Sequence, residues 1–432
     1  MKPSIILAAA SALAMGSAHA LAQEAETGTL VRNIDVFDVE SGLLIQGRDV
    51  YFEGGIVAFT GPTGESDAPA SARVIDGRGM TLLPGLINSH VHLTGVDGAA
   101  GALEAMFALG ITTVRDLGGD TRPLAALERQ RREGERLLPE LVYAAVLGGP
   151  PLMTDQRAIF SSQGFEPGEA PWMRAVTAES DLSAIIADAR ATGATGVKVY
   201  ASLEADLLRE IVEEAHAQGM LVWMHSVIFP ANGADVVAAG PDQIIHTKGL
   251  ASADDTGLPD NFADGVSQYM PRLPFAERPP TDAFYEVLFA DMAGNGIMLD
   301  PSLMADGDLA LALGREVPEP ILALRDWACA ATGAAWRAGV MVGAGTDYAG
   351  QDDLFLRELD RLVECGVSRS GALVAATWNN ARALGIHDRT GRIAPGYEAD
   401  LLLVEGDPTE DLAALRNVRA VFSDGRDVTP VD

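Results

Sequence analysis

Residues 82–95 read LLPGLINSHVHLTG, an apolar run that ends in two histidines, His90 and His92. Side chains along a β-strand alternate between its two faces, so residues two positions apart point the same way. Both imidazoles would therefore project together from the end of one strand. Paired imidazoles suit a metal ion, and a metal site here would need further ligands from elsewhere in the chain.

An apolar strand followed by an amphipathic helix is the pattern that repeats from about residue 80 to 385. The expected strands lie near 83–91, 111–115, 140–147, 196–200, 220–225, 242–246, 296–300 and 340–345. Several helical segments end in glycine, the preferred residue at a helix C-terminus, directly before the next strand. These glycines are Gly110, Gly219, Gly296 and Gly339. The pattern predicts an α/β fold in which a parallel sheet closes into a (β/α)8 TIM barrel, with an open doubly wound sheet as the alternative.

The two flanks of the chain are β-rich and broken by glycine. Neither is long enough to bury a core alone, so we expect them to pair into one small β-sandwich domain built from both chain ends. The expected division is residues 21–80 and 388–432 for the sandwich and residues 81–387 for the barrel. Two barrel loops, 148–178 and 247–280, are long enough to indicate a functional role.

Residues 1–20 have the features of a secretory signal peptide. The basic Lys2 precedes an apolar run, and Ala18-His19-Ala20 is a small-residue cleavage site. The run is too short for a permanent membrane span, and no later stretch is long and charge-free enough to be one. We therefore expect cleavage near Ala20 and an exported, most simply periplasmic, protein. A retained N-terminal anchor is the alternative.

The formal net charge of the chain is −30 at pH 7. Such a charge makes nucleic acids and anionic membrane surfaces unfavourable partners. A small molecule or a short peptide is the expected substrate, and homo-oligomerisation stays open. The two cysteines, Cys329 and Cys365, stand in what look like separate helices. Export would permit a disulfide, but we expect two free, buried thiols.

Polar residues stand at several predicted strand ends, which together form the catalytic face of a TIM barrel. They are His90 and His92 on the first strand, Lys198 on the fourth, His225 on the fifth, His246 on the sixth and Asp347 on the eighth. Alone, each has an ordinary interpretation: a hydrogen-bonded structural histidine, a lysine paired with a carboxylate, or an aspartate at a helix N-terminus. Their convergence on one mouth of one barrel favours a metal site. We expect His216 and His387 at the surface.

This set of residues resembles that of the amidohydrolase superfamily, and the resemblance covers the whole chain after the signal segment. The run LLPGLINSHVHL and the tail GRIAPGYEADLLLVEGDP are similar to those of its branch of imidazolonepropionase-like proteins and prolidase-like metallo-dipeptidases. The resemblance implies a binuclear site, usually of zinc. In that site His90, His92 and Asp347 would hold the more buried ion and His225 and His246 the outer ion, and a carboxylated Lys198 would bridge the two.

The chemistry of the residues agrees with this implication. An unmodified lysine is a cation that repels metal ions, whereas a carboxylated lysine is a bidentate anion. Imidazole and carboxylate ligands suit Zn²⁺, although Mn²⁺ or Fe²⁺ would also bind. A single ion beside an unmodified Lys198 is the alternative.

The implied reaction is hydrolysis of an amide C–N bond by metal-activated hydroxide. Asp347 would act as general acid and base, and His246, beside the outer ion, would help to polarise the carbonyl oxygen. Residues that could bind substrate are Tyr143, Arg157, Tyr200, Lys248 and Tyr348. A cation that binds a carboxylate favours dipeptides or short peptides, as in a dipeptidase or carboxypeptidase. The alternatives are a hydrolase of a cyclic amide, an N-acyl amino acid or a lactone, and a periplasmic binding protein without catalysis.

Overall fold

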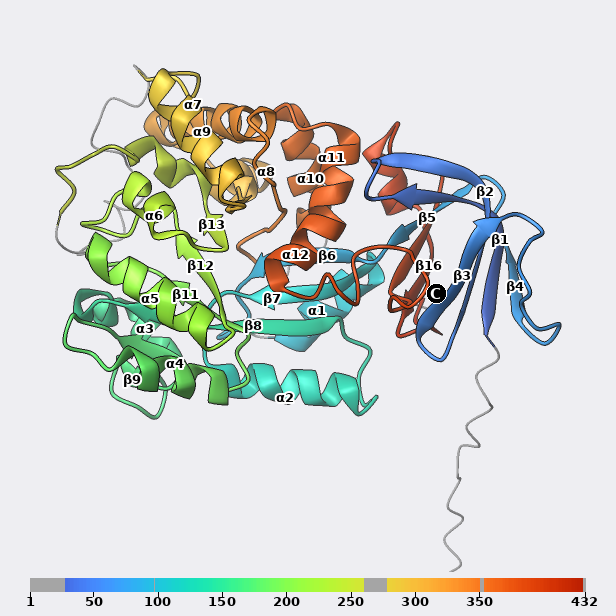
Figure 1. Cartoon of the computed structure of the whole chain (residues 1–432), viewed down its shortest axis with the longest axis horizontal. Helices are drawn as coiled ribbons and strands as arrows, with labels where there is room; N and C mark the ends of the chain where they lie inside the picture. The colour runs from blue at the N-terminus through green and yellow to red at the C-terminus, as the bar shows by residue number, and fades with distance from the viewer. Residues whose placement is uncertain (1–27, 97, 260–277, 350–352, 430–432) are drawn as a thin grey trace, which may run out of the picture.

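The computed structural model describes residues 28–96, 98–259, 278–349 and 353–429. It contains a parallel barrel surrounded by helices and a β-domain at one side of the barrel (Figure 1). The predicted signal peptide, residues 1–20, lies outside the described residues. Among the described helices, none combines the length and the apolar composition that crossing a membrane requires.

Parallel strands form most of the barrel wall. In order around it they are β6 (Leu86–Val91), β7 (Ile111–Asp116), β8 (Glu140–Gly148), β11 (Gly196–Val199), β12 (Leu221–His225), β13 (Gln243–Ile245) and β14 (Met298–Asp300). Each pairs in parallel with the next. The C-terminal end of β8 also pairs with β10 (Met173–Ala175), which pairs antiparallel with β9 (Glu169–Ala170). The prediction of a closed α/β barrel is confirmed.

The eighth segment of the barrel wall, residues 341–347, is extended but forms no regular strand. It hydrogen-bonds to Leu299 of β14 on one side and to Ser89 and His90 of β6 on the other. Its sheet pairing is an isolated bridge between Leu299 and Val342. The segment nevertheless joins the last strand to the first, and so it closes the barrel.

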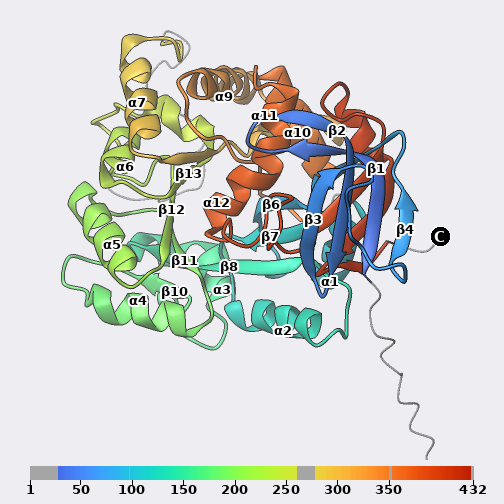
Figure 2. The ribbon, with the colours of Figure 1, turned by 45° about the vertical axis from the view of Figure 1, so that its right-hand side comes forward.

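Helices cover the outside of the barrel, as two views of the ribbon show (Figure 1, Figure 2). The helices are α1 (Ala99–Ala108), α2 (Thr121–Arg132), α3 (Gln156–Ser161), α4 (Leu182–Ala191), α5 (Ala205–Ala217), α6 (Gly233–Ala239), α7 (Ala283–Gly294), α8 (Asp308–Ala312), α9 (Glu319–Arg337), α10 (Leu354–Glu364), α11 (Arg369–Val374) and α12 (Asn380–Leu384). The 3₁₀-helices are η1 (Pro150–Thr154), η2 (Thr247–Ser252), η4 (Leu303–Asp306) and η6 (Leu412–Arg416), and η5 (Ala375–Asn379) is a π-helical segment between α11 and α12. The four glycines predicted at helix ends all have positive φ, which confirms them as C-terminal caps.

Both flanks of the chain contribute to one second sheet. Its strands are β1 (Thr29–Asp38), β2 (Leu43–Glu53), β3 (Ile56–Pro62), β4 (Arg73–Asp76), β5 (Met80–Pro84), β15 (Leu401–Glu405), β16 (Val418–Ser423) and β17 (Arg426–Asp427). They run in the order β17-β16-β15-β5-β1-β2-β3, with β4 beside β1. Phe52 of β2 and Phe422 of β16 are separated by three strands in this order, yet their ring centroids lie 5.0 Å apart. The sheet therefore folds over its own apolar face into the predicted sandwich.

The run 83–91, expected as one strand, passes from one part of the protein to the other. β5 pairs with β1 and β15 in the sandwich, whereas β6 pairs with β7 in the barrel. The break falls at Gly85, whose N–H donates to Asp400 O at 2.8 Å. A Cβ atom at Gly85 would overlap the side chain of Thr112, so this close approach requires glycine.

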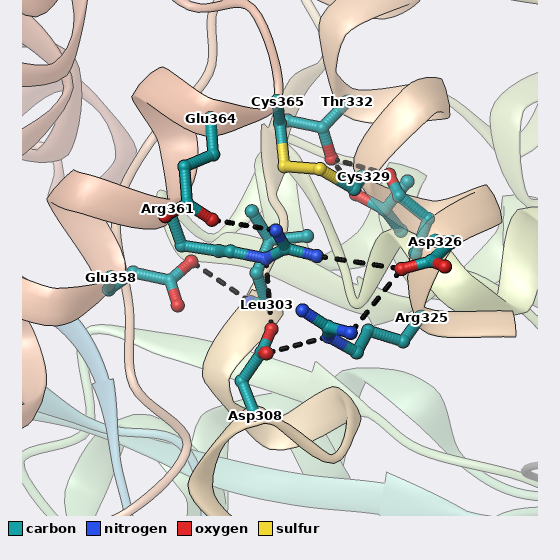
Figure 3. The surroundings of a disulfide bond; sticks show 12 residues. Leu303, Asp308, Arg325, Asp326, Cys329, Thr332, Glu358, Arg361, Glu364 and Cys365 are labelled. Atoms are coloured by element: carbon teal, nitrogen blue, oxygen red, sulfur yellow. Dashed lines mark hydrogen bonds and ion pairs between the residues drawn. A yellow bond between two sulfur atoms is a disulfide. The ribbon is translucent and has the colours of Figure 1, made fainter. Parts of the chain in front are cut away.

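Cys329 and Cys365 form a disulfide, so the expectation of two free thiols is wrong. Cys329 lies in α9 and Cys365 directly follows α10, and their Cα atoms are 4.9 Å apart (Figure 3). That separation is within the range that a disulfide spans. The sequence places the two cysteines in different helices, but it does not show that these helices pack against each other.

Candidate metal centre

The predicted ligands come together at the C-terminal ends of five barrel segments. Asp347 Oδ1 lies 3.0 Å from His90 Nε2, 3.2 Å from His92 Nε2 and 4.0 Å from His246 Nε2. The ring of His225 stands beside that of His246, with centroids 5.1 Å apart. Ligand atoms of His90, His246 and Asp347 lie within 4.8 Å of one another, close enough to share one ion.

The tautomer of His90 follows from its neighbours. Ser302 Oγ donates its hydrogen to Asp300 Oδ1 at 3.0 Å, so the same oxygen accepts from His90 Nδ1, 3.1 Å away. Asp300 Oδ2 lies 3.5 Å from that nitrogen and adds a negative charge beside it. Neutral His90 is therefore protonated on Nδ1 and presents the lone pair of Nε2 to Asp347.

His92 has the same arrangement with a different partner. Its Nδ1 atom lies 3.3 Å from the carbonyl oxygen of Gly118, which can only accept a hydrogen bond. Neutral His92, like His90, then directs a lone pair at Asp347 Oδ1, which is also an acceptor. Acceptors that converge with no hydrogen between them fit a cation, and the imidazole and carboxylate donors here fit a divalent metal ion.

Burial and neighbouring groups shift the pKa values of Asp347 and three of the histidines. Burial opposes ionisation of Asp347, but its electrostatic interactions with the imidazoles of His90 and His246 outweigh burial and hold the pKa of this carboxyl well below its usual range. Burial also lowers the pKa of His92, but the adjacent carboxylate of Asp347 favours the protonated imidazole and outweighs burial, so the pKa is raised. For His225 and His246, burial is the largest cause of a pKa well below the usual histidine value. These two imidazoles are therefore neutral near pH 7, as metal ligands must be.

Lys198 is fully buried, and its Nζ atom has no hydrogen-bond partner within the part of the chain that the structure describes. Burial is the largest cause that lowers the pKa of this amine to about 7. Arg115 lowers it further, whereas Asp347 and Asp300 act in the opposite direction. A neutral amine is the form that reacts with CO2. The unpartnered nitrogen beside the histidines thus fits a carboxylated lysine, whose oxygens would find partners in metal ions.

Three residues of the centre have a backbone conformation that favours glycine. The φ angles are 67° for His246, 49° for Ser302 and 62° for Asp347. Each such residue costs about 1–3 kcal/mol and persists where the surrounding structure holds it. Hydrogen bonds from His246 N to Asp300 O and from Asp347 N to His90 O, both 2.9 Å, do so here. Strain of this kind clusters at functional sites.

Asp300, Ser302 and Arg115 also belong to the centre and were not predicted from the sequence. Asp300 ends the predicted strand 296–300, so the rule that found the other ligands could have found it. Arg115 is fully buried and donates to Ser89 O and Gln243 Oε1, both at 2.6 Å. Nothing in the sequence marks Ser302, because its role depends on the turn that follows β14.

A cavity of about 750 Å³ opens above the centre. Its lining includes His92, His225, His246 and Asp347, together with three of the predicted substrate-binding residues: Arg157, Tyr200 and Tyr348. Arg157 Nη1 donates to Tyr200 Oη at 2.8 Å, and the Tyr200 ring centroid lies 4.1 Å from that of His225. Leu117, Val146, Leu152 and Met173 form an apolar part of the wall.

Two predicted substrate-binding residues lie away from this cavity. Tyr143 and Val146 are three positions apart on β8, so they face opposite sides of the strand, and it is Val146 that lines the cavity. Tyr143 Oη instead donates to Thr192 O at 3.3 Å. Lys248 is buried in η2 and is not part of the cavity lining. Outside the centre, exposed His216 contacts Asp242, and His387 is exposed.

The fold and the cluster define a barrel enzyme with a candidate metal site at the C-terminal ends of its strands. The model of the amidohydrolase family matches residues 81–428. The chain therefore belongs to the amidohydrolase family and is a hydrolase that acts on C–N bonds. This membership confirms the predicted superfamily and favours an enzyme over a binding protein without catalysis.

Individual relatives and solved structures have low sequence identity to this chain. The chain is 26% identical to an imidazolonepropionase of Deinococcus deserti over 83% of this chain and 86% of the relative. A solved structure of a Xaa-Pro dipeptidase with methionine bound in its active site has a TM-score of 0.72 at 22% identity, over 93% of this chain and 99% of that one. Ochratoxinase of A. niger has a TM-score of 0.72 at 20% identity, over 94% and 96%. At these identities the two structures support the fold.

Proposed function

We propose that the protein is a metal-dependent hydrolase that cleaves the amide bond of a dipeptide or short peptide with a free carboxylate. The observation that carries this proposal is the cavity itself, which has the histidine–aspartate cluster at its base and Arg157 on its wall. Arg157 is the one arginine or lysine among the described residues that line this cavity. A guanidinium is suited to pair with a carboxylate, and the apolar wall is suited to a side chain.

The residues of the centre would have separate roles in hydrolysis. His90, His92 and Asp347 would hold one ion, and His225 and His246 a second ion that carboxylated Lys198 would share. Bound there, a divalent ion supplies a water nucleophile at neutral pH and polarises the carbonyl of the substrate. Asp347, ionised at neutral pH, accepts the proton of the attacking water on its carboxylate and returns it to the leaving nitrogen.

The position of Arg157 is fixed by two neighbours. Its Nε and Nη2 atoms donate to Asp155 at 2.9 and 2.8 Å, and Nη1 contacts Tyr200. Tyr200 in turn packs against His225. The guanidinium is thus held on the wall beside the proposed metal ligands, where it would orient the carboxylate end of a substrate.

A library of dipeptides and N-acyl amino acids, each as the free acid and as the C-terminal amide, tests this proposal with added Zn²⁺ and bicarbonate. We expect kcat/KM to favour free acids, by about tenfold or more for one charge-assisted contact. Arg157→Met should remove this preference. Arg122→Met is a matched control, because Arg122 has the same exposure and the same bidentate pairing with an aspartate two residues before it. Equal activity on acids and amides would contradict the proposed substrate class.

A cyclic amide is the second candidate substrate, and the similarity to an imidazolonepropionase favours it. Inactivity on the whole library together with turnover of a five-membered cyclic amide would support this candidate. N-acyl amino acids are covered by the same library, and a lactone series would complete it.

We also propose that the protein is exported, most simply to the periplasm. The composition of residues 1–20 supports this, and so does the Cys329–Cys365 disulfide, because such bonds persist in oxidising compartments. Fractionation of cells that express the full chain, with N-terminal sequencing of the product, would test both export and cleavage near Ala20.

A further inference from the structure

The loop after β14 reaches the metal centre through one side chain. Ser302 Oγ is 3.1 Å from His90 Nδ1 and 3.0 Å from Asp300 Oδ1. Ser302 has a φ of 49°, a conformation that a serine rarely adopts. The Ser302 hydroxyl contacts His90 only in this backbone conformation, so other contacts must stabilise the turn.

Glu358 of α10 holds the two peptide units that follow Ser302. Its side chain has no exposed surface, and its Oε1 and Oε2 atoms accept the N–H groups of Leu303 and Met304 at 2.9 and 2.8 Å. Figure 3 shows the Glu358 carboxylate directed at Leu303. A buried carboxylate is costly unless hydrogen bonds compensate it, and here they come from the residues next to Ser302.

Ion pairs to Asp308 and the disulfide hold α9, α10 and the segment after β14 together. One turn along α10, Arg361 Nε lies 2.9 Å from Oδ2 of Asp308, the first residue of α8, which follows the loop (Figure 3). Arg325 of α9 donates to the other oxygen of Asp308 at 2.6 Å. The disulfide joins α9 to the residue after α10. Both helices that hold the loop are thus fixed to each other.

We propose that Glu358 is a positioning residue for His90, acting through the turn at Ser302. The carboxylate fixes the Leu303 and Met304 N–H groups, the turn fixes the Ser302 hydroxyl, and the hydroxyl fixes the tautomer and ring orientation of His90. This inference rests on the proposed function of the cluster as a metal centre.

The test measures Zn²⁺ affinity by competition with a chromophoric chelator, well below the unfolding temperature of every variant. Glu358→Gln keeps the shape of the side chain but replaces one acceptor by an NH2 group, which cannot accept an N–H. We expect Zn²⁺ affinity to fall by about 10-fold or more, within the 10- to 100-fold range for partners that orient metal ligands. Glu364→Gln controls for the loss of a carboxylate on the same helix, because Glu364 is exposed and contacts neither Leu303 nor Met304 but Arg361.

Ser302→Ala and the double variant separate positioning from general stabilisation. If Glu358 acts through Ser302, Ser302→Ala alone should weaken Zn²⁺ binding to a similar extent, and adding Glu358→Gln should change it less than about twofold. Additive losses, or an affinity of Glu358→Gln equal to that of Glu364→Gln, would overturn the proposal. If Glu358→Gln does not fold, Glu358→Asp serves in the same cycle, since its shorter side chain cannot reach both N–H groups.

A second readout needs no metal. In the metal-free protein, the His90 Nδ1–H signal in an NMR spectrum of ¹⁵N-histidine-labelled protein should be protected in the parent and lost to solvent exchange in Glu358→Gln. An unchanged signal would argue against the positioning role. If the parent binds no Zn²⁺ but this signal still depends on Glu358, the proposed metal function fails while the link from Glu358 to His90 stands.

Discussion

Asp347 contacts His90 twice, once through the backbone and once through the side chain. The Asp347 N–H donates to the carbonyl oxygen of His90 at 2.9 Å, and Asp347 Oδ1 lies 3.0 Å from His90 Nε2. The first contact closes the barrel between its last segment and β6, and the second places a carboxylate against the first histidine. The segment that closes the barrel therefore also places Asp347 against His90.

Replacing Asp347 by asparagine should abolish turnover without emptying the site. An amide has nearly the same shape as a carboxylate but cannot accept the proton of the attacking water. We expect kcat to fall by about 10²- to 10⁴-fold while substantial metal remains, because the four histidines are intact. Steady-state kinetics and elemental analysis of the same sample check this. Near-normal turnover would show that the acid–base role belongs to another group.

Lys198→Met should change the metal stoichiometry. Methionine fills a similar volume but cannot be carboxylated, so it cannot bridge two ions. We expect about two equivalents of metal in the parent protein and about one in the variant, by analogy with carboxylate-bridged sites. Lys248→Met, which alters a second buried lysine, should keep the parent value. One equivalent in both the parent and Lys198→Met would instead favour a single ion beside an unmodified lysine.

Lys198 should also make the free energy of unfolding of the metal-free protein depend on pH. Its pKa is about 7 when folded and near 10.5 when unfolded, so between these values the unfolded chain binds more protons. The free energy of unfolding should therefore rise with pH across this window, at most by about 1.4 kcal/mol per pH unit from this group. Denaturant titrations in CO2-depleted buffer at pH 7 and pH 9 measure it. The difference between the parent and Lys198→Met isolates the lysine, and a difference that does not change with pH would contradict the lowered pKa.

Removing the disulfide should lower the stability of the barrel. Cys329 and Cys365 are 36 positions apart, and closing a loop of this length stabilises a fold by about 4 kcal/mol in the chain-entropy model. Replacing both cysteines by alanine should lower the unfolding temperature measured by calorimetry. A reductant should lower that of the parent by a similar amount and leave the variant unchanged. A reductant effect on the variant would indicate a cause other than this bond.

Much of the site could be predicted because ligands of a parallel barrel follow a local rule. His225 ends an apolar run that β12 matches, and Lys198 lies near the end of β11, so their positions at predicted strand ends were enough to place them at one end of the barrel. The prediction that Tyr143 binds substrate failed because alternate residues of a strand face opposite sides. Which of the two faces of β8 meets the cavity depends on tertiary packing, not on the local sequence. The prediction of two free thiols was wrong because no pattern in the sequence shows that α9 packs against α10.

By itself, the sequence determined the alternation of strands and helices, the glycines that end helices, and the residue types at the strand ends. These depend on local backbone preferences and on hydrophobic periodicity, which act over a few residues. Only the tertiary structure decided which strand ends lie close enough to hold one ion, which face of β8 meets the cavity, and that Glu358 accepts the N–H groups that follow Ser302. Those contacts join segments far apart in the chain, and their geometry is set by the closure of the barrel and the packing of helices around it.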